Sequence, residues 1–223
     1  MPKQPNRDPR APQLAIGLER LEVTGGVFAD EALYEGVRLD GIRFAGVAAD
    51  RVEVKRFVLS EVDLSGAKLD GLDLQDGCIK GCDLSNLRSK GCAFHRVVIE
   101  ASRLTGMMLV EPVLIDVVLR DCPIDLASFR FGRLKRVRFE GCRLIEADFQ
   151  GVVAEACTFI DCDLTGAQLS HGRFTGSAFR GCRLAGVSGL EALRGAQMAW
   201  EDVMELATAL AGSLGIEVRE DIP

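Results

Sequence analysis

The sequence predicts an all-β protein whose chain winds into a four-sided tube, and three observations lead to this fold class. An apolar residue returns at every fifth position from Leu39 to Leu184, with Ser89 as the one polar exception. The residue two positions earlier is never charged, although 27% of the chain is charged. Glycine follows the apolar residue by two positions fourteen times, and four cysteines recur at intervals of twenty. A fixed interval kept over this length is typical of a repeat architecture.

Each five-residue unit is expected to form one side and one corner of the tube. Two inward residues separated by one position fit a short extended segment, because side chains alternate in direction along a strand. The remaining residues must turn the chain, and glycine tolerates the dihedral angles of a tight corner. The glycines at this corner position are Gly36, Gly41, Gly46, Gly66, Gly71, Gly81, Gly91, Gly106, Gly141, Gly151, Gly166, Gly176, Gly181 and Gly186.

A second, longer interval predicts how many sides one coil has. Two residue types repeat at a spacing of twenty, namely Cys122, Cys142, Cys162 and Cys182, and Phe139, Phe159 and Phe179. If like residues stack on like, four units complete one coil and the tube is square, whereas a triangular tube would favour a spacing of fifteen. Successive coils are then expected about 4.8 Å apart, as neighbouring strands are.

The beginning of the chain follows the same rhythm in a different phase. Leu18, Val23, Phe28 and Leu33 are five apart but one residue out of step with Leu39. This predicts further repeats from about residue 15, with a one-residue insertion near Tyr34–Glu35. Residues 1–13 are polar and rich in proline, so we expect a disordered tail there.

Several units carry a motif that is similar to a known family. ADFQG (147–151), CDLTG (162–166) and VDLSG (62–66) resemble the pentapeptide-repeat signature, loosely A(D/N)LXX, and the match covers about residues 31–190. The resemblance, which extends to the Qnr- and MfpA-type members that protect topoisomerases, implies a right-handed quadrilateral parallel β-helix. The expected organisation is a tail at 1–13, a β-helix at 14–190, and a C-terminal helix and tail at 191–223.

The C-terminal segment changes to a helical pattern. Val203, Leu206, Leu210 and Leu214 are spaced as on one face of a helix. Such a helix would cover the last coil, whose unpaired strand edges would otherwise recruit other chains. The resemblance implies a second role, in which these four residues form a homodimer interface. Both roles, capping and dimerisation, stay open.

The resemblance also implies a partner. Its best-known members bind DNA gyrase or topoisomerase IV as non-enzymatic mimics of DNA, and protect the enzyme from inhibitors in antibiotic resistance or self-resistance. An acidic centre at Glu201, Asp202 and Glu205 would fit such mimicry, since residues 191–223 hold 7 acidic and 2 basic side chains. Basic residues between 130 and 138 do not fit it, and their role stays open.

A general protein-interaction scaffold is the alternative function. Val58, Val98 and Val118 recur on one outward position and predict an apolar stripe, and such a stripe can mark a partner site. Strand propensity alone also explains outward valines. Direct nucleic-acid binding is disfavoured by the net charge of −6 and by the presence of only one Trp and one Tyr for base stacking.

Other classes of function are not expected. Seven of the eight cysteines fall on inward positions, which favours free buried thiols over disulfides or a metal site. The two histidines, His95 and His171, fall on outward positions of different sides, so we expect neither a catalytic site nor a cofactor. The sequence has no apolar run of membrane-spanning length and no signal-peptide pattern at its start, which predicts a cytoplasmic protein.

Overall fold

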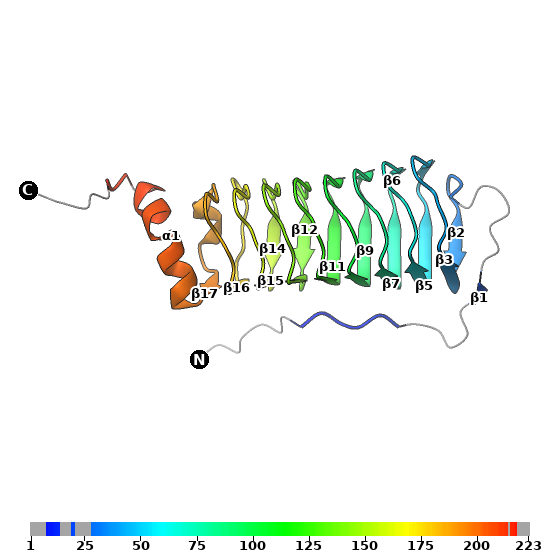
Figure 1. Ribbon diagram of the computed structural model, residues 1–223, viewed down its shortest axis with the longest axis horizontal. Coiled ribbons are helices and arrows are strands. Elements are labelled where there is room, and N and C mark those ends of the chain that lie inside the picture. Colours follow the sequence, from blue (N-terminus) through cyan, green and yellow to red (C-terminus); the bar gives the residue numbers. More distant parts are fainter. Residues whose placement is uncertain (1–7, 14–18, 21–27, 214, 218–223) are drawn as a thin grey trace, which may run out of the picture.

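The computed structural model describes residues 8–13, 19–20, 28–213 and 215–217 of the 223-residue chain. Its main body is a straight rod of stacked coils with a helix across the C-terminal end (Figure 1), which confirms the predicted fold class. The elements are β1 (Glu19–Arg20), β2 (Leu33–Glu35), β3 (Val37–Asp40), β4 (Ala48–Asp50), β5 (Glu53–Ser60), β6 (Lys68–Asp70), β7 (Asp73–Lys80), β8 (Arg88–Lys90), β9 (Ala93–Glu100), β10 (Met108–Val110), β11 (Val113–Arg120), β12 (Arg133–Lys135), β13 (Arg138–Glu140), β14 (Val153–Glu155), β15 (Thr158–Ile160), β16 (Ala178–Arg180), the 3-10 helix η1 (Leu190–Leu193), β17 (Gln197–Met198) and the helix α1 (Trp200–Ser213).

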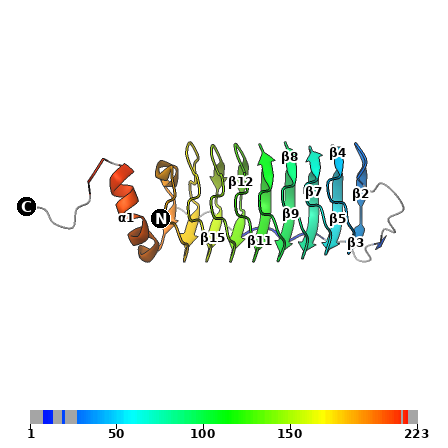
Figure 2. The same cartoon turned by 45° about the horizontal axis from the view of Figure 1, so that its top comes forward.

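Parallel pairing between successive coils advances by twenty residues, as predicted. Leu59 lies opposite Ile79, and Ile79 lies opposite Ile99. Strands β5, β7, β9 and β11 each continue round a corner, so each contributes to two sides of its coil (Figure 2). Among the described residues, this pairing gives one sheet of thirteen strands and one of four.

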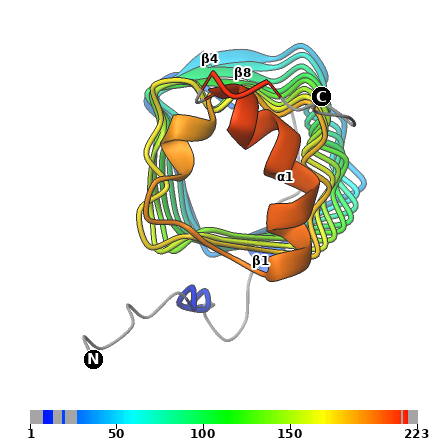
Figure 3. The same ribbon diagram turned by 90° about the vertical axis from the view of Figure 1, so that its left-hand side faces the viewer.

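We number the four sides in the order in which the chain visits them, and the end view in Figure 3 shows all four. Side 1 holds β3, β13 and β15. Side 2 holds isolated bridges such as Arg43↔Asp63. Side 3 holds β4, β6, β8 and β10, and side 4 holds β2, β12 and β14.

The inward positions form one continuous core. Every fifth residue from Leu39 to Leu184 is buried except Phe44, which is half-buried against the core. In the C-terminal half, phenylalanine rings stack from coil to coil. The ring centroids of Phe139 and Phe159 are 4.8 Å apart and nearly parallel, and those of Phe159 and Phe179 are 4.7 Å apart. These distances equal the spacing of neighbouring strands, so each ring meets its equivalent in the next coil.

The cysteines lie where the repeat predicts. All eight are free thiols; seven are buried and Cys78 is half-buried. Cys142, Cys162 and Cys182 belong to one column, since the residues that follow them are paired in register at intervals of twenty. Burial raises the pKa of the Cys92 and Cys157 thiols to about 12. These side chains therefore act as small apolar groups of the core.

Every corner of the tube from Glu31 to Gly186 uses a left-handed backbone conformation. The fourteen predicted corner glycines all have φ between 60° and 70°, and eighteen other residues, such as Asp116 and Phe131, have positive φ at the same position of their units. This conformation costs a residue with a side chain about 1–2 kcal/mol. Corner N–H groups donate to carbonyls of the next coil, as in Glu61 N to Lys80 O at 3.0 Å, and this pairing offsets the cost.

The first coil corrects one prediction. Tyr34 pairs with Val54 and contacts the core, whereas Leu33 is 56% exposed. The prediction that Leu33 faces inward is therefore wrong. Because Phe28 is buried, the extra residue lies between Phe28 and Tyr34, before the predicted position. Leu18 and Val23 lie outside the described residues.

The N-terminal segment also differs from the expected tail. Residues 8–13 run beside the rod (Figure 1), where the N–H of Arg10 donates to Asp116 and the N–H of Gln13 donates to Asp76. Residues 1–7 lie outside the described part. Within the described residues, none of the helices combines the length and the apolar character needed to cross a membrane.

Candidate functional site

The helix α1 covers the end of the last coil, and two of its side chains accept hydrogen bonds from the backbone of that coil. Asp202 is buried, and its two carboxylate oxygens accept hydrogen bonds from the N–H groups of Gly181 and Cys182, both at 3.2 Å. Glu205 accepts from the N–H of Leu184 at 3.2 Å. Elsewhere such N–H groups donate to the next coil. The two carboxylates therefore replace the acceptors that a further coil would supply, and they satisfy an edge that would otherwise be unpaired.

This cap uses much of the predicted dimer interface. Leu206 is 1% exposed and belongs to the core, while Leu210 and Val203 are half-buried. Leu214 lies outside the described residues. The apolar face of the helix packs mainly on the chain's own last coil, which Figure 3 shows beneath α1.

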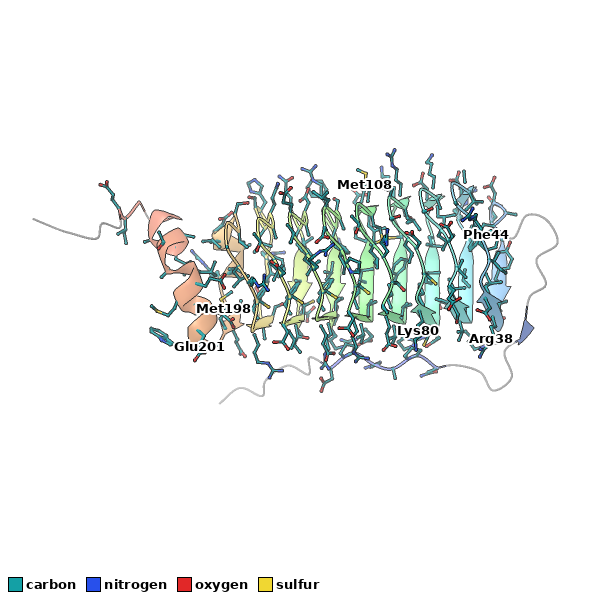
Figure 4. The ribbon with its side chains drawn as sticks, viewed as in Figure 1. Arg38, Phe44, Lys80, Met108, Met198 and Glu201 are labelled. Carbon is teal, nitrogen blue, oxygen red and sulfur yellow. The ribbon has the colours of Figure 1, made fainter. Side chains whose placement is uncertain are left out.

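The outer face of α1 carries apolar residues that the sequence analysis did not single out. Trp200 is 71% exposed and Met204 is also exposed. They are four residues apart, so they share one helical face. Of the predicted acidic centre, Glu201 is exposed at this end (Figure 4), whereas Asp202 and Glu205 accept hydrogen bonds from backbone groups of the last coil. The sequence feature that could have identified the exposed apolar face of α1 is the four-residue spacing of Trp200 and Met204.

A second surface lies on side 3 and beside it, at mid-length. We define the mid-rod patch as Met108, Leu126, Arg130, Phe131 and Val153; its four apolar members are all exposed. Met108 points away from the rod in Figure 4 and bridges to Ser128 of the next coil. Aromatic residues, Met and Arg are the residue types enriched in protein interfaces.

The ring of Phe131 is exposed yet held in position. It lies over Gly151 of the next coil, where an added Cβ would approach the ring to 2.6 Å. The guanidinium carbon of Arg130 is 5.8 Å from the ring centroid, and Arg130 also pairs with Asp148 at 3.3 Å. An ordered aromatic side chain loses little conformational entropy on binding, which favours it as an anchor for a partner.

The predicted apolar stripe is a true column. Val98 lies opposite Val118, and Val58 joins the same column through Cys78. All three valines are half-buried on side 1. In the next coil after Val118 the column continues with Arg138, whose guanidinium pairs with Asp8 of the N-terminal segment.

The basic residues between 130 and 138 are largely paired with carboxylates. Lys135 lies 3.4 Å from Glu155, and Arg136 binds Asp116 through two hydrogen bonds of 2.6 and 2.7 Å. Arg130 and Arg138 have the partners given above. Opposite charges therefore alternate along the rod, and this band is not an isolated positive surface.

The most enclosed charge pairs lie at the corner between sides 4 and 1. Asp76 receives two hydrogen bonds of 2.6 Å from Arg96, and these lower the pKa of the Asp76 carboxyl. Burial by itself would raise the pKa of Asp116, which is 4% exposed, but hydrogen bonds from Arg136 and from the Arg10 N–H hold it below its usual range. We call the column Asp76, Arg96, Asp116 and Arg136 the corner ladder.

This ladder predicts a defined dependence of stability on pH. Asp116→Asn is expected to lower the free energy of unfolding by about 2 kcal/mol at pH 7, because it weakens a charged hydrogen-bonded pair. The folded-state pKa of Asp116 is depressed. The extra stability of the wild type over Asp116→Asn is therefore complete at pH values well above about 3.9, the pKa of an unfolded-chain Asp. It is lost as pH falls through the folded-state pKa. Urea denaturation between pH 7 and pH 2.5 measures this difference. Glu31→Gln, at the exposed pair with Arg51, should change little; a difference for Asp116→Asn that is as large at pH 2.5 as at pH 7 would contradict the assignment.

Neither a metal-binding cluster nor a pair of neighbouring histidines occurs in the described residues. Among them, no three His, Cys, Asp or Glu side chains are grouped to hold a metal ion. His95 lies on side 4 in β9, and His171 lies at a corner beyond side 3. The apolar interior is packed by the core described above.

Comparison with known proteins identifies the repeat. A family model described as a pentapeptide repeat region matches residues 132–192, and a second, described as pentapeptide repeats (8 copies), matches residues 55–86. A comparison with curated protein sequences finds no significant match.

Several solved structures are similar to the chain at low identity. HetL, a pentapeptide repeat protein involved in heterocyst differentiation regulation from the cyanobacterium Nostoc sp., is 15% identical, with 75% of this chain and 87% of HetL covered and a TM-score of 0.31. A trypsin-treated variant of QnrB1, a plasmid-mediated fluoroquinolone resistance protein, is 19% identical, with 92% and 98% covered and a TM-score of 0.41. At these values the individual structures decide nothing about function.

Proposed function

The chain belongs to the pentapeptide-repeat family, and from this premise we propose that it acts without catalysis, by binding a type II topoisomerase such as DNA gyrase and protecting it from inhibitors. The observation that carries the binding function is the mid-rod patch. Its exposed Phe131 and Met108 sit beside Arg130 on a rigid, regularly paired scaffold. A few such anchors provide most of the affinity of a protein interface.

The choice of a topoisomerase rests on the family resemblance of the repeats. Mimicry of DNA by a uniformly acidic rod is not part of the proposal, because opposite charges alternate along the sides and pair with each other. Two of the three carboxylates of the predicted acidic centre also bind the chain's own backbone. Contact through apolar and mixed-charge surface fits these residues better than contact through a polyanion.

The proposal includes a homodimer through the outer face of α1. Trp200 and Met204 form an exposed apolar pair at the end of the rod, and burying such side chains against a second copy would contribute about 1.5–3 kcal/mol each. Leu206 supports the helix from below and does not face the second copy. Light scattering of wild type and of Trp200→Glu tests this arrangement, which predicts a dimer and a monomer respectively.

The topoisomerase proposal is tested by supercoiling of relaxed plasmid by purified gyrase in the presence of a fluoroquinolone. Wild-type protein at micromolar concentration is expected to preserve supercoiling. Phe131→Asn is expected to need at least tenfold more protein, because it removes the anchor while Asn tolerates the left-handed corner. His171→Asn is the matched control, since His171 has the same corner conformation two coils away.

The outcomes separate the partner from the surface. If wild-type protein has no effect on gyrase with or without the drug, the topoisomerase is the wrong partner. If wild type protects and Phe131→Asn protects equally, the partner stands and the mid-rod patch is the wrong surface. In the first case the alternative of an interaction scaffold with another partner is the next to be tested, with the half-buried stripe of Val58, Val98 and Val118 as its second candidate surface.

A further inference from the structure

The N-terminal segment is bonded to the corner ladder at regular intervals. The N–H of Gln13 donates to Asp76 Oδ1 at 2.9 Å, and the N–H of Arg10 donates to Asp116 Oδ1 at 3.1 Å. Two residues before Arg10, Asp8 pairs with Arg138, one coil further along the rod. The segment therefore follows the axis of the rod (Figure 1), and these contacts attach it at three levels.

The spacing of the N–H donors in the segment matches the spacing of the carboxylate acceptors in the corner ladder. Asp76 and Asp116 are two coils apart, because each coil takes twenty residues, and two coils span about 9.6 Å. The donors Arg10 and Gln13 are three residues apart in the chain. Three residues of polyproline II helix make one turn and span about 9.3 Å. One turn of such a helix thus carries an N–H from one carboxylate to the next.

The sequence of the segment suits that conformation. Pro9 and Pro12 are also three residues apart, and they are the two half-buried residues of a segment whose other members are exposed. Each proline is followed directly by a residue whose N–H reaches the ladder. Proline has no N–H to donate and favours the polyproline II dihedral angles. With the P-x-x-P spacing, both prolines face the rod, and the N–H of the residue after each proline donates to the ladder.

The ladder is built to receive such a peptide. Arg96 and Arg136 each hold one aspartate through two hydrogen bonds, which fixes both carboxylates. In both aspartates Oδ1 also accepts the peptide N–H. The corner lies beside the half-buried column of Val98 and Val118, which supplies apolar surface next to the acceptors. Charged acceptors make these hydrogen bonds stronger than neutral ones.

We propose that the corner ladder is a docking surface for a proline-rich segment of another polypeptide, bound as a polyproline II helix with P-x-x-P spacing, and that residues 8–13 occupy the surface in the isolated chain. The carboxylates at every second coil select the three-residue repeat of this helix. The segment in cis acts as a competitor, which a partner must displace. This surface lies between sides 4 and 1, shares no residue with the mid-rod patch, and does not depend on the topoisomerase proposal.

Limited digestion of the full chain by trypsin tests the contact in cis. Cleavage after Arg10 is expected to be slow in the wild type, because the bonded segment cannot enter the protease in an extended form. Asp76→Asn combined with Asp116→Asn is expected to raise the cleavage rate about tenfold, while Glu31→Gln, a corner residue whose partner is Arg51, leaves it unchanged. Equal rates for wild type and the double variant would overturn the contact. Circular dichroism confirms that each variant is folded.

A labelled peptide tests docking in trans. The probe has the sequence of residues 8–13, DPRAPQ, and the receptor is the full chain with Pro9→Gly and Pro12→Gly, which weakens the competitor without touching the ladder. Fluorescence anisotropy is expected to show saturable binding that is at least tenfold weaker when Asp76→Asn and Asp116→Asn are added to the receptor, or when both prolines of the probe are glycine. No binding, or binding that ignores these changes, would refute the docking surface.

Discussion

Replacing Gly77 by alanine is expected to lower the free energy of unfolding by about 3 kcal/mol, the upper end of the usual cost of overpacking a core. Gly77 occupies an inward position of β7, opposite Phe57 of the preceding coil. A Cβ at this position would overlap the ring of Phe57, which is fully buried. Because stacked coils repeat the same geometry, the ring has no free space to move into.

A second substitution identifies the cause. Phe57→Leu should recover a large part of the stability of Gly77→Ala, although Phe57→Leu alone is destabilising, since the smaller side chain leaves room for the new methyl group. Gly91→Ala is the control: it has the same added methyl at a corner with φ of 68° and no atom within 4 Å, so it should cost about 1 kcal/mol and show no coupling to Phe57. Urea denaturation followed by circular dichroism measures the three single variants and the two double variants that contain Phe57→Leu. Equal losses for Gly77→Ala with and without Phe57→Leu would contradict the overlap.

Replacing Asp202 by alanine is expected to have a comparable effect, about 3 kcal/mol. The change leaves the N–H groups of Gly181 and Cys182 without acceptors, and each buried unsatisfied group costs about 1–3 kcal/mol. It also loosens α1, so the strand edge of the last coil becomes available to other chains. We therefore expect both a lower midpoint of urea unfolding and self-association detectable by light scattering.

Two variants in the same turn of α1 provide controls for the cap. Glu201→Ala removes an exposed carboxylate and should change stability by less than about 0.5 kcal/mol. Asp202→Asn keeps one carbonyl oxygen as an acceptor and should lose less than Asp202→Ala. If Asp202→Ala, Asp202→Asn and Glu201→Ala all lose the same stability, the loss comes from helix propensity and charge. The hydrogen bonds from the last coil to Asp202 would then not explain it.

The body of the rod could be predicted from the sequence because each coil repeats the environment of the last. A residue twenty positions away is a spatial neighbour, so the cysteine and phenylalanine intervals translate directly into columns, as Phe139 and Phe159 show. The phase at the start could not be predicted, because either Leu33 or Tyr34 can satisfy an apolar pattern. In the structure Tyr34 pairs with Val54, so Tyr34 and not Leu33 occupies the inward position.

The surface features were harder to predict because they depend on three-dimensional neighbours. Helical spacing showed that Leu206 would be buried but could not say against which surface, and the chain's own last coil provides it. Phe131 stands at a corner, where its side chain points outward whatever its polarity; the signal was an aromatic residue at a glycine position. Asp202 lies twenty residues after Cys182, which is the length of one coil, and accepts a hydrogen bond from its N–H as a residue of a further coil would. From composition alone, Asp202 is recognised only as a negative charge.

The stacked rings of Phe139, Phe159 and Phe179 also make the two halves of the rod mechanically unequal. Contacts in such a coil run only to the neighbours above and below, so local opening starts where those contacts are smallest. In the first coils Phe28 meets Phe44 edge-on and Phe57 lies opposite Gly77, whereas the last coils have a column of stacked rings closed by the hydrogen-bonded helix α1. Denaturation should therefore advance as a front from the N-terminal coils toward α1, with the aromatic half as the last part of the molecule to lose its shape.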